Sequence, residues 1–289
     1  MRYTLENSFS GSKFHLFEKN NFLYIKKYFD KISIRDLHSF SKQMHFDSYN
    51  IKKLKIESAN IIKINKKKNF IILKHYEGLS GSELLLQSDV QVFNFLNIFF
   101  CSYIKNLFNN LKLVKINKNI YLKKINQIQK NTHKDHNKLV KIFLKKILKL
   151  LKKIKFNIKD NNCHGDLTLS NLIVNKKNKK IVLIDFLSTY KETPLQDVCK
   201  ILQDLRLYWS SRYLNQNDHL RAKIICDNIK PFGSIKKNKL RKEIYKILEL
   251  EMLMTLFRIL PYIKKKDIVT VDWIKTSIRK INKNFLINI

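Results

Sequence analysis

The sequence is poor in glycine, proline, alanine and cysteine, with 5 Gly, 3 Pro, 2 Ala and 4 Cys among 289 residues. So little glycine and proline excludes a collagen-like chain and a Gly/Pro-rich low-complexity chain. The cysteines lie far apart and form no CxxC pair, so neither a zinc ribbon nor a disulfide framework is indicated. We therefore expect a reduced, cytoplasmic protein whose fold depends on a packed apolar core.

Long apolar runs are also missing. Residues 1–14 lack a charged start followed by an apolar stretch and a cleavage site, so no secretory signal is expected. The most apolar window, 92–108, is interrupted by Asn94, Asn97 and Lys105 and is too short and polar to span a bilayer. We therefore predict no transmembrane segment.

Positive charge is abundant, because 58 Lys and Arg face 23 Asp and Glu, a formal net charge of +35. Such a surface suits nucleic acid or an anionic membrane. However, the chain has 50 Lys, 38 Ile and 30 Asn against only 8 Arg, a split that follows A/T-rich codons. We favour this compositional bias as the cause and expect no nucleic-acid partner. A functional polyanion-binding surface, including peripheral membrane contact, stays the alternative.

The first 77 residues carry the pattern of short strands around one helix. Aromatic and β-branched runs separated by turn residues predict strands, and Ser33 is a suitable cap for a helix with apolar residues at helical spacing. The predicted strands are 15–17, 22–29, 55–64 and 70–76, and the predicted helix is 33–44. The outcome is a small antiparallel sheet with one helix.

After Gly78 the pattern changes to long helices. We predict helices over 90–113 and 135–155, a strand-turn-strand insert over 163–186, and a helical chain from residue 195 onward. The helix over 135–155 has an apolar stripe opposite a lysine face. We expect it to pack on a core, although a membrane surface or a partner could also bind such a helix.

The most informative segment runs from His164-Gly165-Asp166 through Asn171 to Asp185. Two short strands between Asn171 and Asp185 would form a hairpin that brings both side chains to one point. Mg²⁺ takes few protein oxygen ligands and leaves its other positions to water and phosphate. Asp166 is then left to orient or deprotonate an attacking hydroxyl. The layout predicts phosphoryl transfer.

The pattern H-G-D-x-x-x-x-N at 164–171, followed by Ile184-Asp185-Phe186, resembles the aminoglycoside phosphotransferase and choline kinase-like branch of the protein-kinase fold. The resemblance implies an α+β, bilobal protein kinase-like fold. A small antiparallel-sheet lobe (1–77) would bind nucleotide, and a large helical lobe (78–289) would carry catalysis and the acceptor. It implies ATP and Mg²⁺ as cofactors, Asp166 as catalytic residue, and Asn171 and Asp185 as metal ligands.

Further matches extend the resemblance over about residues 10 to 210. It implies that Lys26 contacts the nucleotide phosphates, with Lys27 as a rival, and that a hinge with Tyr76 and Glu77 holds adenine. Gly11 and Ser12 would belong to a phosphate loop. His164 and Asp197 would support the catalytic loop rather than react.

The sequence also departs from the family pattern. The phosphate loop has a single glycine, and the helix over 33–44 has no Glu to pair with Lys26, so that only Asp36 or Gln43 could substitute. Leu187 stands where protein kinases have glycine after the metal aspartate and phenylalanine.

Pro194 follows Asp185 only nine residues later, which leaves too short a chain for a peptide-docking activation segment, so a small hydroxylated acceptor is expected. Candidates for lining its pocket are Asp204, Tyr208, Trp209, Glu249, Glu251 and Arg258. The leading hypothesis is an ATP-dependent kinase for a hydroxyl of a sugar, aminosugar or amino alcohol. The alternatives are a non-catalytic pseudokinase that binds nucleotide or a partner, and a kinase for a large anionic acceptor such as a lipopolysaccharide sugar.

Overall fold

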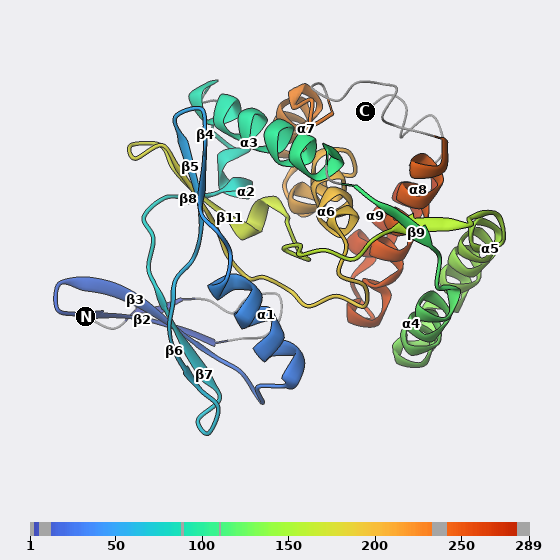
Figure 1. The fold of residues 1–289 in the computed structure, drawn as a ribbon, viewed down its shortest axis with the longest axis horizontal. Coiled ribbons are helices and arrows are strands. Elements are labelled where there is room, and N and C mark those ends of the chain that lie inside the picture. Colours follow the sequence, from blue (N-terminus) through green and yellow to red (C-terminus); the bar gives the residue numbers. More distant parts are fainter. Residues whose placement is uncertain (1–2, 6–12, 88–89, 110, 233–241, 282–289) are drawn as a thin grey trace. The chain divides into compact units, whose positions relative to one another are not determined.

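The computed structural model describes residues 3–5, 13–87, 90–109, 111–232 and 242–281. Packing divides the chain into two compact units: unit 1 spans Met1–Leu84 and Ser170–Ser188, and unit 2 spans Leu85–Leu169 and Thr189–Ile289 (Figure 1). The predicted α+β class is confirmed, since strands dominate the N-terminal part and helices the C-terminal part. The functional lobe boundary after residue 77 stays a prediction.

Unit 1 contains an antiparallel sheet in the order β1-β2-β3-β7-β6. Its strands are β1 (Tyr3–Leu5), β2 (Lys13–Lys19), β3 (Phe22–Tyr28), β7 (Phe70–Lys74) and β6 (Ile61–Asn65). The predicted hairpin is confirmed, with Lys19 paired to Phe22. Its two turn residues, Asn20 and Asn21, both have positive φ (50° and 61°), the geometry of a two-residue turn that asparagine tolerates well.

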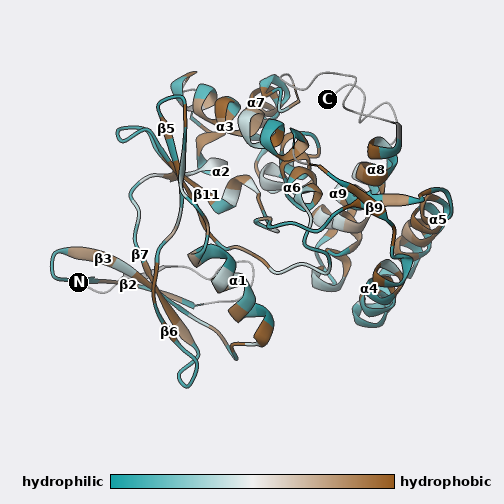
Figure 2. Ribbon diagram, in the orientation of Figure 1, coloured by the Kyte–Doolittle hydropathy of each residue, from teal (hydrophilic) through white to brown (hydrophobic). Residues whose placement is uncertain are grey.

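The predicted helix is α1 (Ile34–Met44), and its start follows from the sequence. Ser33 and Asp36 form a reciprocal capping box, which satisfies backbone donors of the first turn. The apolar side of the helix packs on the sheet in a core around Phe40, Ile61 and Ile71. The opposite side is polar, and Figure 2 shows both colours along the helix.

A second sheet of unit 1 has the order β4-β5-β12-β11-β8. Its strands are β4 (Tyr49–Ile51), β5 (Leu54–Ser58), β12 (Lys180–Leu183), β11 (Leu172–Asn175) and β8 (Leu79–Ser80), which leads into the short α2 (Gly81–Leu84). The prediction of one strand over 55–64 is therefore wrong. The chain passes from one sheet to the other at Ala59 and Asn60, because Ala59 N–H donates to Leu183 while the Asn60 carbonyl accepts from Lys74.

Unit 2 is mainly helical. Its helices are α3 (Val90–Asn109), α4 (Lys118–Asn131), α5 (Asn137–Lys153), α6 (Pro194–Leu205), α7 (Gln216–Asn228), α8 (Lys242–Phe257) and α9 (Ile268–Lys280), with a two-stranded sheet of β9 (Leu113–Lys115) and β10 (Phe156–Ile158). The helical character after residue 195 is confirmed for the described residues. The predicted helix over 90–113 was too long, because Leu113 already belongs to β9. The helix α4 had no counterpart in the prediction.

The core of unit 2 lies around α8, which packs against α5, α6 and α9. Residues 250–257 of α8 are buried all round, so the C-terminal half of this helix has no polar outer face. Helix α5 presents the predicted apolar stripe, with Phe143 and Ile147 fully buried, but Ile142 is 45% exposed. Within the described residues, no helix has the length and apolar character that a membrane crossing requires.

Candidate active site

Asp166 belongs to an irregular loop of unit 2 that a buried carboxylate supports. Asp197, in the first turn of α6, accepts hydrogen bonds from the backbone N–H groups of His164 (2.8 Å) and Gly165 (2.7 Å). The Tyr103 hydroxyl also donates to Asp197 (2.7 Å). Gly165 has φ +86°, a conformation that glycine adopts without strain. Asp197 thus fixes the backbone just before Asp166.

His164 is buried beneath the same loop. Its Nδ1 atom lies 3.2 Å from the backbone nitrogen of Asp166 and accepts a hydrogen bond from it. An imidazole used in this way orients the backbone on which Asp166 stands. It is therefore placed as a support of the loop.

The carboxylate of Asp166 is paired with Lys200 of α6, at 2.9 Å from Nζ to Oδ1. The Asp166 side chain is 31% exposed and that of Lys200 13%. Burial would raise the pKa of Asp166, but the charge and hydrogen bond of Lys200, followed by the electrostatic effects of His164 and Arg258, hold it below its ordinary value. Asp166 is therefore an anion at neutral pH, as an acceptor of a hydroxyl proton must be.

Asp204, a candidate for the acceptor pocket, supports the other end of the loop. It is buried and accepts hydrogen bonds from Leu169 N–H and from the N–H and hydroxyl of Ser210. Burial raises the pKa of Asp204 above its ordinary value, against these hydrogen bonds. The neighbouring candidate Tyr208 donates its hydroxyl to Asp227 (2.6 Å).

Aromatic stacking engages another acceptor candidate, Trp209. Its ring meets that of Trp273 edge-on, with centroids 4.9 Å apart, and the Arg212 guanidinium lies 3.4 Å from its ring centroid. This arrangement is typical of cation–π packing. Trp209 therefore contributes to packing between the loop after α6 and α9.

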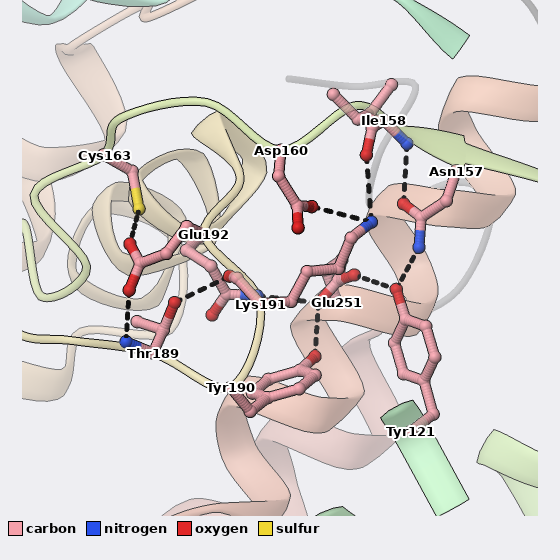
Figure 3. A network of polar contacts seen from close by, with 11 residues as sticks. Tyr121, Asn157, Ile158, Asp160, Cys163, Thr189, Tyr190, Lys191, Glu192 and Glu251 are labelled. Carbon is pink, nitrogen blue, oxygen red and sulfur yellow. Dashed lines mark hydrogen bonds and ion pairs between the residues drawn. The ribbon is translucent and has the colours of Figure 1, made fainter. Parts of the chain in front are cut away.

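Glu251 of α8 is the centre of a buried polar network (Figure 3). It accepts hydrogen bonds from the Tyr121 hydroxyl, the Tyr190 hydroxyl (2.6 Å) and the Gln196 side-chain amide (2.8 Å). Because a buried carboxyl group needs hydrogen-bond partners, these contacts explain how Glu251 is accommodated in the core. Glu251 was predicted to line the acceptor pocket, and the structure places it inside the packed helices.

Two further acceptor candidates lie on α8 and just after it. Glu249 is partly buried, and that burial raises the pKa of its carboxyl group. Arg258 donates to the Gln196 side-chain oxygen (3.0 Å) and lies 5.8 Å from the Tyr190 ring centroid. Among the acceptor candidates, Arg258 is the one whose positive charge lowers the pKa of Asp166.

The segment before α6 is fixed to unit 2 by side chains that the sequence analysis did not single out (Figure 3). Tyr190 reaches Glu251, and the buried Lys191 donates to the Ile158 carbonyl (2.9 Å). Glu192 accepts from the Thr189 N–H (2.7 Å) and the Cys163 thiol (3.1 Å). Apart from the local bond between Thr189 and Glu192, these contacts link residues far apart in sequence, which local spacing could not predict.

Asn171 and Asp185 belong to unit 1, at one end of the β11–β12 hairpin. Leu172 pairs with Leu183, and Ile184 N–H donates to the Asn171 carbonyl (3.1 Å), so the two residues flank the open end of the ladder. They contribute an amide and a carboxylate oxygen, the hard donors that Mg²⁺ prefers. Their placement and chemistry fit a cation that obtains its other ligands from phosphate and water.

The lysine that reaches Asp185 is Lys27, not Lys26. Lys27 Nζ lies 2.8 Å from Asp185 Oδ1, whereas Lys26 Nζ lies over the rings of Tyr28 (4.7 Å) and Phe70 (4.1 Å). Successive side chains of a strand point to opposite faces, so only one of the two can face the hairpin. Lys27, which the sequence kept as the rival, is therefore the lysine that faces the hairpin, and the choice of the lysine that contacts phosphates stays a prediction.

No residue of α1 pairs with Lys27 in place of the missing glutamate. Asp36 is engaged in the capping box with Ser33, and Gln43 donates to the Ala59 carbonyl (2.7 Å). In the described part of unit 1, the carboxylate that binds Lys27 is Asp185 itself.

The predicted nucleotide residues are only partly described. Gly11 and Ser12 lie outside the described residues. Tyr76 accepts a hydrogen bond from Asn60 N–H (3.2 Å), and the Glu77 carbonyl accepts one from the Asn175 amide (3.1 Å). Gly78 has φ +147°, and a Cβ there would lie 2.6 Å from the Val174 carbonyl oxygen, so glycine is required. The predicted hinge around Tyr76 and Glu77 is thus attached to the β11–β12 hairpin.

Comparisons with solved structures found kinases of small molecules. An ethanolamine kinase of Plasmodium vivax is 14% identical, with a TM-score of 0.55, over 100% of this chain and 83% of that one. Aminoglycoside phosphotransferase APH(4)-Ia is 11% identical, with a TM-score of 0.58, over 97% of this chain and 92% of that one. A thermostable mutant of that enzyme, in ternary complex with ADP and hygromycin B, is 13% identical, with a TM-score of 0.53, over 97% and 92%.

No protein-family model matches the chain, and no curated protein is similar to it in sequence. At identities of 11 to 14%, the likeness to solved structures establishes the fold alone. The resemblance inferred from the motif at 164–171 is thereby confirmed at the level of fold: the chain has the kinase-like fold of the aminoglycoside phosphotransferases and ethanolamine kinase.

Proposed function

We propose that this protein is an ATP-dependent phosphotransferase of the aminoglycoside phosphotransferase and choline kinase-like family, acting on a hydroxyl group of a small molecule. The observation that carries the proposal is the anionic Asp166, held on a backbone that Asp197 fixes and followed in sequence by the Asn171–Asp185 hairpin. The kinase-like fold supports it.

In the proposed reaction, the acceptor hydroxyl oxygen forms a bond to the γ-phosphorus of ATP while the bond to the β,γ-bridging oxygen breaks, releasing ADP. Asp166 orients the hydroxyl and receives its proton. Asn171 and Asp185 would hold Mg²⁺, which would neutralise the phosphate charge. Lys27, rather than Lys26, contacts the phosphates. Positioning and charge stabilisation supply most of the rate in such reactions.

The nucleotide would bind through residues 1–77, with adenine at the linker around Tyr76 and Glu77 and the phosphates near Gly11 and Ser12. The acceptor would bind through residues 78–289. We place the protein in the cytoplasm, and the absence of a disulfide among its four cysteines, all of them in the described chain, is compatible with this.

A small acceptor is supported by the segment after Asp185. It is short, and Tyr190, Lys191 and Glu192 tie it to unit 2, which leaves little free chain to dock a peptide. The similar structures include an ethanolamine kinase and a hygromycin B complex, so amino alcohols and aminosugars are the acceptors to test first.

The test is ADP release from Mg·ATP, measured with a panel of sugars, aminosugars and amino alcohols. We expect one acceptor class to raise turnover and Asp166→Asn to lower that turnover by about 10²- to 10⁴-fold. Asp160→Asn is the matched control, since it changes an exposed carboxylate of the same loop. Nucleotide binding without acceptor-dependent ADP release, in the wild type as in Asp166→Asn, would instead support a pseudokinase.

A further inference from the structure

One side of α1 contacts the chain that follows Asp185. The Arg35 guanidinium donates to the Ser188 carbonyl from Nε (2.9 Å) and Nη2 (2.7 Å), and Lys42 Nζ donates to the Leu187 carbonyl (2.8 Å). Ser39 accepts a hydrogen bond from Ser188 N–H at 2.7 Å. Positions 35, 39 and 42 lie on one face of a helix, so the three side chains act on the same two residues.

The same helix is also tied to the strand beside β12. Gln43 donates its side-chain amide to the Ala59 carbonyl (2.7 Å), and the Ser58 hydroxyl donates to the Gln43 carbonyl (2.8 Å). Ala59 N–H donates to the Leu183 carbonyl (2.8 Å), two residues before Asp185. These bonds connect α1 to the chain entering the Asp185 turn, as Arg35, Ser39 and Lys42 connect it to the chain leaving the turn.

The turn at Asp185, which lies between these two sets of hydrogen bonds, has an unusual backbone conformation. Asp185 has φ +57°, in the left-handed region that residues with a side chain adopt less readily than glycine. Such a conformation persists when its surroundings fix it. The ring of Phe186 packs edge-on against that of Phe46, with centroids 5.6 Å apart, so the residue after Asp185 is fixed as well.

We propose that Arg35, Ser39 and Lys42 are positioning residues that hold the Asp185 turn in its metal-binding conformation. They do so by binding the backbone of Leu187 and Ser188. In the family pattern, a glutamate of this helix would instead hold the lysine that contacts the phosphates. The lysine is held differently here, because Lys27 pairs with Asp185 itself. The inference rests on the proposed metal role of Asp185 and deepens it.

The predicted consequence is a defect in metal binding that spares nucleotide binding. Arg35 is exposed, so its loss removes two hydrogen bonds to the turn without opening a core. Residues that orient a metal ligand change metal affinity by about 10- to 100-fold. We expect Arg35→Met and Ser39→Ala to weaken Mn²⁺ binding about tenfold while leaving the affinity for metal-free ADP unchanged.

The test is titration of the full chain with Mn²⁺ in the presence of ADP, with free Mn²⁺ measured by electron paramagnetic resonance. Arg35→Lys should recover part of the affinity, because a lysine can make one of the two bonds. Lys31→Met, which removes an exposed positive charge just before α1, is the matched control and should bind Mn²⁺ like the wild type. Amide hydrogen exchange at Leu187 and Ser188 should accelerate in Ser39→Ala and not in the control.

The variant Asp185→Asn distinguishes the metal role of Asp185 from the positioning role of the α1 side chains. If Asp185→Asn weakens Mn²⁺ binding and both Arg35→Met and Ser39→Ala bind like the control with unchanged exchange, the positioning role is overturned and the metal role stands. If Asp185→Asn itself binds Mn²⁺ as the wild type does, the proposed metal site is wrong, and the inference fails with it.

Discussion

Two aspartates that the sequence nominates, Asp185 in unit 1 and Asp166 in unit 2, are each paired with a lysine of similar burial. Lys27 lies 2.8 Å from Asp185 in unit 1, and Lys200 lies 2.9 Å from Asp166 in unit 2. The lysine side chains are 10% and 13% exposed, and the aspartates 42% and 31%. What differs is the support behind each aspartate.

The loop of Asp166 is supported by a charge in the core. Asp197 is fully buried and accepts from two backbone N–H groups and the Tyr103 hydroxyl. The turn of Asp185 is supported instead from α1, where Arg35 at the surface donates two hydrogen bonds and the part-buried Lys42 and buried Ser39 make the others. Support from a buried charge couples the site to the stability of the unit, whereas surface support affects the site with little effect on folding.

The largest expected effect is on stability, from Asp197→Ala. Removing this carboxylate leaves three buried donors without their acceptor, at a cost of about 3–5 kcal/mol in the free energy of unfolding. Urea denaturation followed by circular dichroism measures the loss, and Asp160→Ala, at an exposed carboxylate, should change stability little. If Asp197→Ala lowers the free energy of unfolding by less than about 1 kcal/mol, the proposed difference between the support of Asp166 and that of Asp185 is contradicted.

The second prediction concerns the lysines of β3. Lys27→Met should lower kcat/KM for ATP by about 100-fold, the size expected when a positioned donor to a reacting group is removed. Lys26→Met is the matched control from the adjacent position on the opposite face, and we expect it to act like the wild type. Steady-state kinetics with varied ATP decide between them, and a larger effect at Lys26 would return the phosphate role to that residue.

Local features of the fold could be predicted from the sequence, and long-range pairing could not. The turn before Phe22 and the Ser33 cap depend on neighbouring residues, so both were predicted correctly. The break at Ala59 depends on a partner more than a hundred residues away, Leu183, and nothing in the run 55–64 marks it. The predicted helix end at Leu113 was wrong for the same reason. The helix ends at Asn109, because pairing with β10 makes Leu113 a strand residue.

The candidate site divides in the same way. Asp166, Asn171 and Asp185 lie within one short segment, and their spacing was enough to nominate them. The choice between Lys26 and Lys27 depends on which face of β3 each side chain occupies, and a one-residue shift reverses it. Arg35 makes contacts at a separation of 153 residues, beyond the reach of sequence patterns. Glu251 has the chemistry of a ligand-binding residue, but only the structure reveals its buried partners.

The smallest expected effect, on the pH dependence of activity, tests the pair in unit 2. Lys200 lowers the pKa of Asp166, while burial acts to raise it. The proposed reaction requires the Asp166 carboxylate, so activity should fall as the pH drops through this pKa. In Lys200→Met, the positive charge that lowers the pKa of Asp166 is lost, while burial still raises it. The pKa of Asp166 therefore rises, and the acid limb of the pH profile of kcat/KM moves to higher pH.

Lys200→Arg keeps the positive charge and should keep the acid limb near its wild-type position. If Lys200 had a purely structural role, its loss would lower activity equally at all pH values.

The corresponding change in unit 1, Lys27→Met, should lower activity across the whole pH range, because Lys27 is proposed to act on phosphates. A shift of the acid limb in Lys27→Met with none in Lys200→Met would mean that Asp185, rather than Asp166, is the carboxylate whose protonation limits the reaction, and the roles of the two aspartates would have to be exchanged.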